Sequence, residues 1–353
     1  MAALGAALIG AGNISQSHAR GYVEADDAEL IGAYDILPER ASEKAAKFGF
    51  ETIYDSLEQL LDDKRVDAVS VCTPNRWHAP QALAALTAGK HVLVEKPMTT
   101  TAAEGEALCA AAESSGRIAM VAMCMRFSPD YALLKQRIGE GAFGEIYQVN
   151  ITYVRRRGIP RMGGWFTTHA ESGGGALIDC GVHYLDMALW LLEPAAPVSV
   201  TASVGSYFGS REPYVFTDMW GTRVEGGPFD VDDSAAAFIR MDSGAVIVLQ
   251  TAWAGNRLQT QGTEVLGTEM GCRIAGGQLV FYGEDAAHEH LIDVSPQLGK
   301  RNVYTAEVAH FLARCRTGEP PIAPPADGLR AVRVIEAIYQ SAEQRREVQL
   351  VAR

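Results

Sequence analysis

The chain has 353 residues, of which 48% are hydrophobic and 21% charged. This length exceeds what one hydrophobic core usually supports, so two domains are expected, and the composition excludes a disordered chain. Lys and Arg number 31 against 43 Asp and Glu, which gives a formal net charge of −12. A protein this acidic lacks the basic surface that nucleic-acid or anionic-membrane binding requires, so neither partner is expected.

Cysteine usage and apolar runs bear on the cellular compartment. No two cysteines form a C-x-x-C pair, so neither a zinc site nor a disulfide framework is expected, and the protein is expected to be cytoplasmic. Residues 1–9 are apolar but lack a basic segment, and no apolar run approaches the roughly 20 residues of a membrane span, so we expect neither a signal peptide nor a membrane anchor. The cysteines stand at positions 72, 109, 124, 180, 272 and 315.

The first 125 residues alternate between short apolar strands and helices. Predicted strands cover 6–9, 29–34, 68–72, 91–95 and 118–123, and predicted helices follow Gly12 and cover 38–48, 56–61, 78–87 and 101–114. Strands that alternate with helices indicate a parallel sheet with helices on both faces. The sequence therefore predicts an α/β fold, with a doubly wound parallel sheet of the Rossmann type in residues 1–125.

A Gly-x-Gly-x-x-Ser pattern, formed by Gly10, Gly12 and Ser15, follows the first predicted strand and opens a helix. This is the context that a dinucleotide fingerprint requires. Gly10 permits the tight turn, Gly12 lets the backbone approach a pyrophosphate, and the helix N-terminus supplies amide donors. Ser15 occupies a position where Gly or Ala is usual. The pattern predicts a dinucleotide whose pyrophosphate lies over Gly12 and Asn13.

Asp35 follows the second predicted strand, near the position expected for a carboxylate that binds the adenosine ribose. Ile36 and Leu37 come next, so no arginine adjoins Asp35 to receive a 2′-phosphate. This favours NAD over NADP. Arg40 lies within reach of the same corner and is counted among the cofactor-binding candidates.

Glu95, Lys96 and Pro97 end a buried strand, at the edge where open α/β sheets bind ligands. A residue before proline favours extended geometry, so Lys96 should project from the strand end. Near a cationic nicotinamide, a lysine with a lowered pKa exchanges protons near neutrality. The alternative is a solvent-exposed loop lysine.

Three glycines, Gly173 to Gly175, precede a segment with leucines at helical spacing. If a helix begins near Asp179, then Asp179 and His183 stand one turn apart on one face. A carboxylate beside an imidazole orients it for proton transfer at neutral pH. The alternatives are a helix cap with a core histidine, or two metal ligands; the sequence offers no clear third ligand, so no metal site is expected.

Residues 126–353 have a different pattern, in which strands predominate. Strands are predicted at 146–154, 198–208, 235–241, 245–252 and 279–282, and helices at 304–315 and 329–345. Strands with short turns indicate a large, mostly antiparallel sheet. The sequence therefore predicts a second, α+β domain over residues 126–353 for substrate binding and oligomerisation, whose last helix can pack back on the first domain.

The loop after the strand at 146–154 carries three arginines, Arg155 to Arg157, and Trp165 follows shortly before the triple glycine. Trp165 is suited to stack on a sugar ring, and an arginine to bond a hydroxyl or carboxylate. We count Tyr153, Arg155, Arg157 and Trp165 as substrate-binding candidates. The alternatives are a solvated charge run with a packed tryptophan, or an arginine paired across a subunit interface.

Four segments together resemble the glucose–fructose oxidoreductase, inositol dehydrogenase and rhizopine-catabolism (Gfo/Idh/MocA) family of sugar dehydrogenases. They are Gly10–Ile14, Cys72–His78, Glu95–Pro97 and Gly173–Asp186, and they appear in the family's order across nearly the whole chain. The resemblance implies a nicotinamide-dependent enzyme whose second domain contains a large open sheet, often used for self-association. A homodimer or homotetramer through that sheet is therefore expected.

The resemblance also implies roles for individual residues. Lys96, Asp179 and His183 stand at the reacting centre and contact the substrate. Arg126 falls where the family's chain leaves the first domain. The implied cofactor contacts, beyond Asp35 and Arg40, are Gly10, Gly12, Asn13, Ile14, Thr73, Pro74, Asn75, His78, Glu95, Lys96 and Arg126.

The resulting expectation is an NAD-dependent oxidoreductase that transfers a hydride between a sugar or cyclic polyol and nicotinamide. Either Lys96 or His183 removes the hydroxyl proton, and Asp179 orients the pair. Two alternatives remain at this stage. One is a glycosidase or lyase that oxidises its substrate transiently, with no net cofactor turnover; the other is a non-catalytic NAD(P)-sensing regulator.

Overall fold

The structure is a computed structural model, and it describes residues 3–211, 214, 223–285 and 288–350. The chain divides into two compact units. The first unit is Met1–Phe127 with Arg301–Val332, and the second is Ser128–Lys300 with Arg333–Arg353. The domain boundary predicted between residues 125 and 126 stays a prediction.

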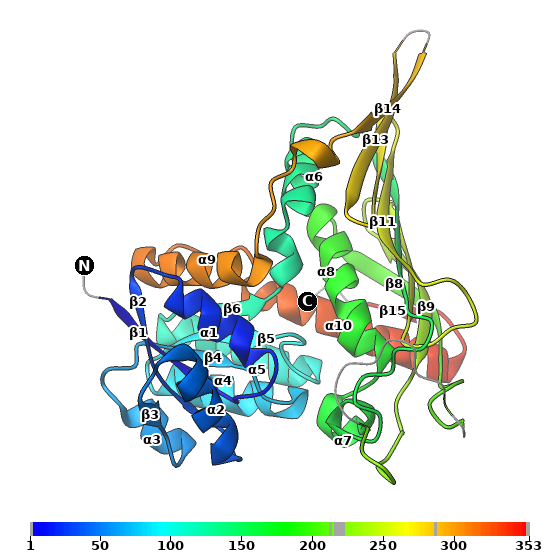
Figure 1. The fold of residues 1–353 in the computed structure, drawn as a ribbon. Coiled ribbons are helices and arrows are strands. Elements are labelled where there is room, and N and C mark those ends of the chain that lie inside the picture. Colours follow the sequence, from blue (N-terminus) through cyan, green and yellow to red (C-terminus); the bar gives the residue numbers. More distant parts are fainter. Residues whose placement is uncertain (1–2, 212–213, 215–222, 286–287, 351–353) are drawn as a thin grey trace. The chain divides into compact units, whose positions relative to one another are not determined.

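The first unit contains a six-stranded parallel sheet in the order β3-β2-β1-β4-β5-β6 (Figure 1). This is the strand order of the Rossmann fold, whose order reverses between β1 and β4. Both strands are fully buried apart from Leu4, as expected for a parallel sheet covered on both faces. The strands are β1 Leu4–Ile9, β2 Ala28–Tyr34, β3 Thr52–Ile53, β4 Ala68–Val71, β5 His91–Glu95 and β6 Ala119–Ala122.

Helices connect these strands, and a helix from late in the chain joins them. In Figure 1, α9 (Val303–Thr317) runs beside α1 (Ser15–Val23). A Cβ on Gly21 would lie 2.6 Å from the Cβ of Val308, so only glycine permits this close approach of the two helices. The other helices of this unit are α2 Pro38–Phe48, α3 Leu57–Asp62, α4 His78–Thr87 and α5 Ala102–Ser115, with 3₁₀ turns at Asn75–Trp77 and Cys124–Phe127.

The second unit is built on a nine-stranded sheet in the order β14-β13-β12-β11-β7-β10-β9-β8-β15. Its neighbouring strands are antiparallel, except that β7 and β10 run parallel at its centre. The predicted combination of a Rossmann sheet with a large, mostly antiparallel sheet is confirmed. The strands are β7 Ile146–Val154, β8 Pro197–Gly205, β9 Ser234–Met241, β10 Val246–Ala252, β11 Thr260–Gly267, β12 Met270–Ala275, β13 Gln278–Asp285, β14 His288–Asp293 and β15 Val348–Gln349.

A π-helical segment, Leu177–Gly181, precedes the buried helix α8 (Val182–Leu191). The expectation of an α-helix starting near Asp179 was therefore wrong. Asp179 lies in the π-helical turns and His183 in α8, so α-helical spacing does not describe the pair. Short π-helical segments have i→i+5 hydrogen bonds and occur frequently at functional sites. The remaining helices are α6 Pro129–Gly139, α7 His169–Ser172 and α10 Pro325–Gln344, with 3₁₀ turns at Trp165–Thr167 and Ser295–Gln297.

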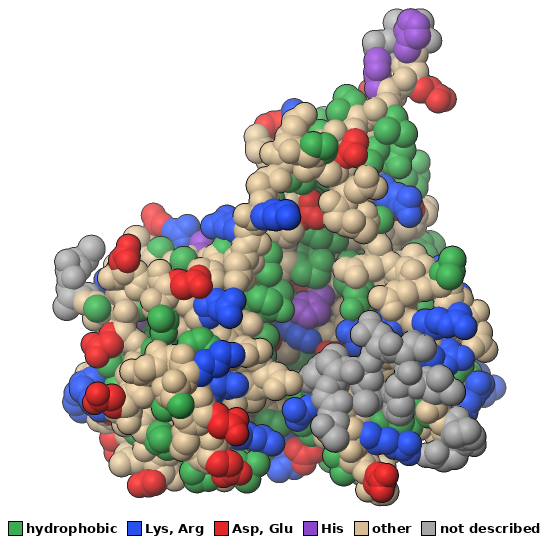
Figure 2. Space-filling model, viewed as in Figure 1, with side chains coloured by type: hydrophobic (Ala, Val, Ile, Leu, Met, Phe, Trp, Pro, Cys, Tyr) green, Lys and Arg blue, Asp and Glu red, His purple; other side chains and the backbone are tan. Residues whose placement is uncertain are grey.

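Five strands were not predicted: the two-residue strands β3 and β15, and the longer strands β11, β12 and β14. The sequence of β11 contains glycine, glutamine and glutamate, which are poor strand formers, and every residue of β14 is exposed. Pairing with neighbouring strands outweighs these local preferences. Figure 2 shows histidine side chains at the tip of the β13–β14 hairpin and hydrophobic side chains below it. Among the described residues, no helix is long and apolar enough to cross a bilayer.

Candidate active site

The turn between β1 and α1 has the geometry of a phosphate-binding loop. Gly10 has a φ of +90°, and a Cβ there would lie 2.8 Å from Cγ2 of Thr73, so glycine is required. At Gly12 an added Cβ would meet no described atom within 4 Å, so the backbone is open to a ligand. The Ser15 hydroxyl donates to the carbonyl of Gly12 over 2.7 Å, which explains how serine fits the third position. No side chain caps α1, which leaves its first amides for an anion.

The Asp35 carboxylate stands at the end of β2 and connects two turns. It accepts from the Ala11 amide at 2.7 Å and from the Leu37 amide at 2.9 Å. A carboxylate has lone pairs beyond these two bonds, which suit it to ribose hydroxyls. Ile36 is 80% exposed beside it and Arg40 is exposed on α2. These residues fit a nicotinamide dinucleotide without a 2′-phosphate, and Arg40 stays a candidate contact.

Replacing Asp35 with alanine should weaken NAD binding by roughly 10-fold or more, since hydrogen bonds to a charged acceptor are lost. NADP should lose less affinity, because its 2′-phosphate is repelled by the native carboxylate. Titration of each cofactor by calorimetry measures both constants. Asp62→Ala, at an exposed position on α3, is the control. An equal loss for the two cofactors would contradict the assigned role of Asp35.

His78 connects the two loops that carry the nicotinamide-side candidates. Its Nδ1 lies 2.7 Å from the carbonyl oxygen of Pro97, and its Nε2 lies 2.8 Å from that of Thr73. Burial lowers the pKa of this imidazole. The bonds to the two carbonyls act in the opposite direction but are outweighed. His78 thus fixes the backbone around Thr73 and Pro97. Asn75, in the adjoining 3₁₀ turn, is buried.

A buried polar network lies behind Lys96. The Glu95 carboxylate bonds to Nε2 of His18 at 2.9 Å and accepts from the Lys96 amide at 3.1 Å. Nδ1 of His18 lies 3.0 Å from the Ser70 hydroxyl, which in turn lies 2.8 Å from the hydroxyl of Tyr22. Burial raises the pKa of Glu95, but the bond and charge of His18, with the charge of Lys96, outweigh it and hold that pKa below its usual range. An ionised Glu95 therefore fixes the backbone of Lys96.

A second carboxyl lies near Glu95. Glu307, on α9, is 0% exposed, and neither of its oxygens has a hydrogen-bond partner among the described residues. Burial, and then the charge of Glu95, raise the pKa of Glu307 well above its usual range. Glu307 therefore keeps its proton to a higher pH in the folded protein than in the unfolded chain.

This proton makes stability depend on pH. In the unfolded chain Glu307 ionises above about pH 4.5, whereas the raised pKa in the folded protein delays ionisation to higher pH, so its contribution to stability falls as pH rises from about 4.5 toward the folded pKa. Glu307→Gln should be more stable than the wild type at neutral pH, with a difference that grows by up to about 1.4 kcal/mol per pH unit. Urea unfolding from pH 4 to 8 measures it. Glu307→Leu is a second variant without an ionisable group at this position. A difference in stability from the wild type that does not change with pH would contradict the explanation.

The side chain of Arg126 is buried and hydrogen-bonded within the first unit. Its side chain is 1% exposed, and Nη1 donates to the carbonyl of Ile322 at 2.6 Å and to Asp327 at 2.7 Å. These bonds connect the 3₁₀ turn after β6 to the start of α10 within the first unit. Nη1 of the guanidinium thus has structural partners, and the predicted contact of Arg126 with the cofactor stays a prediction.

In the second unit the Asp179 carboxylate has two neighbouring donors. The Trp253 indole Nε1 donates to Oδ2 at 2.9 Å, and the Cys180 thiol donates to the same oxygen at 3.2 Å. Asp179 and His183 are both partly exposed, whereas most of the helix around them is buried. The two polar groups are therefore the accessible part of an otherwise apolar segment.

Arg155 belongs to the surroundings of Asp179. Its guanidinium donates to the Tyr153 hydroxyl at 3.1 Å and to the Gly158 carbonyl at 3.1 Å. Burial lowers the pKa of Arg155, but the fields of Cys180, Tyr153 and Asp179 outweigh it and raise that pKa. Two predicted substrate residues, Tyr153 and Arg155, thus bond to each other and interact electrostatically with Asp179.

The other two predicted substrate residues have different partners. Arg157 donates to the Gly255 carbonyl at 3.0 Å and lies 4.6 Å from the centre of the Phe208 ring. Trp165 is stacked on Phe166, with ring centres 3.7 Å apart. Arg157 therefore stabilises the turn after β10, and no contact described here connects either residue to Asp179.

The predicted catalytic residues come from both units: Lys96 from the first, Asp179 and His183 from the second. In the part of the chain that the structure describes, no group of three or more His, Cys, Asp or Glu side chains is placed to hold a metal ion.

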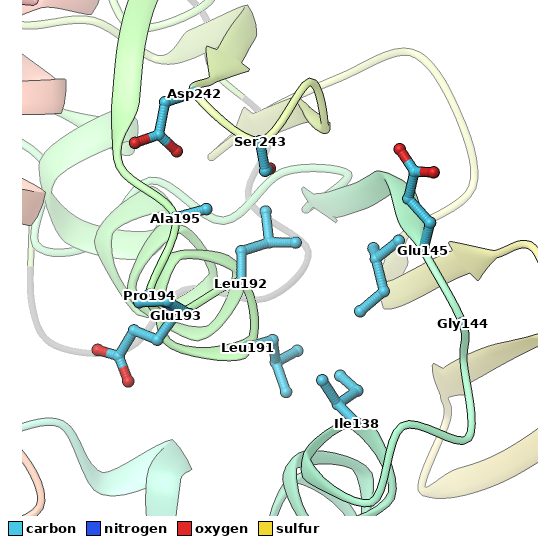
Figure 3. Close-up of a pocket in the computed structure, with 11 residues that line it drawn as sticks. Ile138, Gly144, Glu145, Leu191, Leu192, Glu193, Pro194, Ala195, Asp242 and Ser243 are labelled. Carbon is cyan, nitrogen blue, oxygen red and sulfur yellow. The ribbon is translucent and has the colours of Figure 1, made fainter.

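A separate pocket of about 390 Å³ lies in the second unit (Figure 3). The acidic side chains of Glu145, Glu193 and Asp242 line it, with leucines and Ile138 between them. None of the predicted site residues belongs to it.

Sequence reasoning missed three residues of this arrangement: His18, Trp253 and Glu307. His18 carried a weak signal, because it is a polar residue in the helix that follows the glycine loop. Trp253 bonds to Asp179 across 74 residues, and Glu307 is distant in sequence from Glu95, whose charge acts on it. No local pattern indicates such contacts.

Comparison with known proteins agrees with this geometry. Residues 4–123 match the family described as "Oxidoreductase family, NAD-binding Rossmann fold", and residues 131–273 match the "GFO/IDH/MocA C-terminal domain". D-glucoside 3-dehydrogenase of Escherichia coli (strain K12) is 30% identical over 350 residues, covering 98% of this chain and 97% of that protein. scyllo-Inositol 2-dehydrogenase (NAD(+)) of Bacillus subtilis (strain 168) is 30% identical over 332 residues, covering 90% and 87%.

A solved structure, "Levoglucosan dehydrogenase, complex with NADH", superimposes with a TM-score of 0.88 at 27% identity, covering 99% of this chain and 100% of that one. The Rossmann sheet with its dinucleotide loop defines an NAD-dependent oxidoreductase. The chain belongs to the Gfo/Idh/MocA family. The predicted fold, family, reaction class and cofactor are confirmed.

Proposed function

We propose that the enzyme oxidises a hydroxyl group of a sugar or cyclic polyol with NAD. The observation that carries this proposal is the construction around Lys96, whose backbone is fixed at the end of β5 by an ionised, buried Glu95. A protein that only senses a nucleotide has no need of a lysine held in this way. The names of the relatives, which act on glucosides and inositols, support this substrate class.

The residues of the first unit fit the cofactor. Gly10 keeps the turn tight, the backbone at Gly12 is open, and Asp35 presents carboxylate oxygens at the end of β2. The remaining cofactor contacts we propose are Asn13, Ile14, Thr73, Pro74, Asn75, His78 and Glu95, with Arg40 at the adenosine end. NAD supplies the carbon that accepts the hydride, and the protein supplies positioning and proton transfer.

Three side chains carry out proton transfer in this proposal. His183 removes the proton of the substrate hydroxyl, since an imidazole titrates near neutral pH. Lys96 bonds the same oxygen and stabilises negative charge as it develops. Asp179 orients the substrate and favours the charged imidazole after proton transfer. In reduction the same groups act in reverse.

The substrate is bound mainly by the second unit. We propose that Tyr153 and Arg155 bond its hydroxyls near Asp179; the bond between Tyr153 and Arg155 and the electrostatic effect of Asp179 on Arg155 support this. Trp165 is a further candidate that presents an aromatic face. Arg157 contributes indirectly, through the turn at Gly255.

Self-association through the nine-stranded sheet, as a homodimer or homotetramer, is also proposed. Alternation along β9 and β13 buries Ile239 and Phe281, whereas their neighbours Phe238 and Tyr282 are exposed on the opposite face. Exposed aromatic side chains on a sheet face support an interface. Sedimentation velocity tests it. A cytoplasmic location is proposed on the absence of disulfides among six free cysteines.

The deciding experiment is a panel of glycosides, inositols and sugar acids, assayed with NAD and NADP at the NADH absorbance band. Net accumulation of NADH with a sugar or polyol supports the proposal. Formation of product without net NADH would contradict the proposal and indicate a glycosidase or lyase that oxidises its substrate transiently. Cofactor binding without turnover of any member would favour a regulator.

A further inference from the structure

Trp253, the residue directly after β10, has an exposed fraction of 0% and is the largest fully buried side chain among the described residues. Its ring packs in an apolar cluster that includes Ala176, Cys180 and Phe208. A buried indole N–H needs a hydrogen-bond acceptor. The acceptor here is Oδ2 of Asp179, at 2.9 Å.

The backbone of Trp253 is itself fixed. Its amide donates to the carbonyl oxygen of Asp233 at 2.9 Å. The Asp233 carboxylate accepts from the amides of Tyr207, Phe208 and Gly209 at 2.6–3.0 Å. The carboxylate thus fixes Asp233 to residues 207–209, and the carbonyl of Asp233 fixes the backbone of Trp253 at the end of β10. The indole therefore has little freedom to turn away from Asp179.

The neighbouring Asp232 fixes the backbone that carries Asp179. Its carboxylate accepts from the amides of Gly175 and Leu177, at 2.7 and 2.9 Å, and from the Tyr339 hydroxyl at 2.7 Å. A Cβ on Gly175 would lie 1.7 Å from the carbonyl oxygen of Asp232, so the contact is as close as glycine allows. Two adjacent aspartates thus hold Asp179 and Trp253.

We propose that Trp253 is a positioning residue, whose indole N–H fixes one oxygen of Asp179 and keeps that carboxylate ionised and directed for catalysis. A single well-placed donor from a rigid, buried ring both selects one rotamer and favours the charged form. The inference rests on the proposed function only in that Asp179 acts in catalysis. The contact itself belongs to the second unit.

Other charged or titratable groups also act on Asp179. Arg155, from the loop after β7, and Tyr153, on β7, interact with it electrostatically. Cys180 bonds to the same oxygen as Trp253, and His183 lies further along the same helical segment. The test therefore has to separate the effect of the indole from theirs.

The test compares wild type, Trp253→Phe, Asp179→Asn and the double variant. Trp253→Phe keeps an aromatic ring and removes the donor. It should lower kcat by roughly 10-fold, the scale of one hydrogen bond to a charged group, with the NAD dissociation constant unchanged. The rise of kcat with pH, which the proposed function assigns to deprotonation of His183, should move to higher pH, because a carboxylate without the indole donor favours the charged imidazole more strongly. In the double variant the indole loss should have no further effect.

Trp190→Phe, on α8 in the same unit, is the control for loss of a buried indole and should leave the profile in place. A Trp253→Phe enzyme with wild-type kcat and profile, while Asp179→Asn is impaired, would overturn the inference and leave the proposed function intact. Independent effects of the two substitutions in the double variant would also overturn it.

An NMR measurement needs neither activity nor a folded Trp253 variant. The protein is labelled with ¹⁵N-tryptophan, and the indole resonances of the other four tryptophans are assigned by substituting each in turn. The remaining resonance, that of Trp253, should titrate with pH in the wild type and not in Asp179→Asn. A resonance that is the same in both proteins would overturn the inference. Absence of turnover on every substrate would count against the proposed function alone.

Discussion

Replacing Lys96 with alanine is expected to lower kcat by about 100-fold or more, the usual scale for a lost acid–base or charge-stabilising group. The dissociation constant of NAD should change by no more than a few-fold, because Glu95 still bonds the backbone amide at position 96. Stopped-flow measurement of hydride transfer, with cofactor titration on the same preparation, separates the two effects.

Lys90→Ala makes an informative comparison. Lys90 is a buried lysine of the first unit whose ammonium group bonds to the carbonyls of Asp63 and Val66, away from the strand end that carries Lys96. That substitution should lower stability and leave kcat of the folded enzyme near its wild-type value. Unchanged turnover in Lys96→Ala would remove Lys96 from the mechanism.

The second large effect concerns His183. His183→Asn keeps a polar side chain without a group that titrates near neutrality, so kcat should fall by about 100-fold or more. The residual activity should lack the rise near neutral pH that deprotonation of an imidazole produces in the wild type. Profiles of kcat from pH 5 to 9 measure both consequences.

His169→Asn provides the matched substitution, since His169 is an exposed histidine on α7 of the same unit. It should leave the rate and the profile unchanged. If His183→Asn keeps the wild-type profile, the titrating base is another group. Lys96 would then be the first to consider.

The first unit was predicted well because its signals are local. Apolar strands that alternate with helices, and glycines at a strand-to-helix turn, lie within a few residues of one another. The tight turn at Gly10 and the carboxylate of Asp35 both occur where their spacing places them. The second unit was predicted less completely. Its strands β11 and β14 have few apolar residues, and sheet pairing decides their conformation.

The site shows the same division. Lys96, Asp179 and His183 belong to short motifs and were named from the sequence. The groups that hold them are distant along the chain: His18 bonds to Glu95 across 77 residues, and Trp253 to Asp179 across 74. A sequence identifies the groups with chemistry, whereas the support for those groups depends on tertiary contacts. Arg126 likewise has a partner that no local pattern indicates, since its guanidinium bonds to Asp327 across 201 residues.

The parallel pair at the centre of the nine-stranded sheet has a consequence for how the chain folds. Strand β7 lies between β10 and β11, and both partners come about 100 residues later in the sequence. Neither edge of β7 is covered until the ribosome has synthesised those strands. Pairing over such a separation is slow, and uncovered edges invite association with other chains. We therefore expect the nascent second unit to depend on chaperones, whereas β1 and β2 of the first unit pair across a few tens of residues.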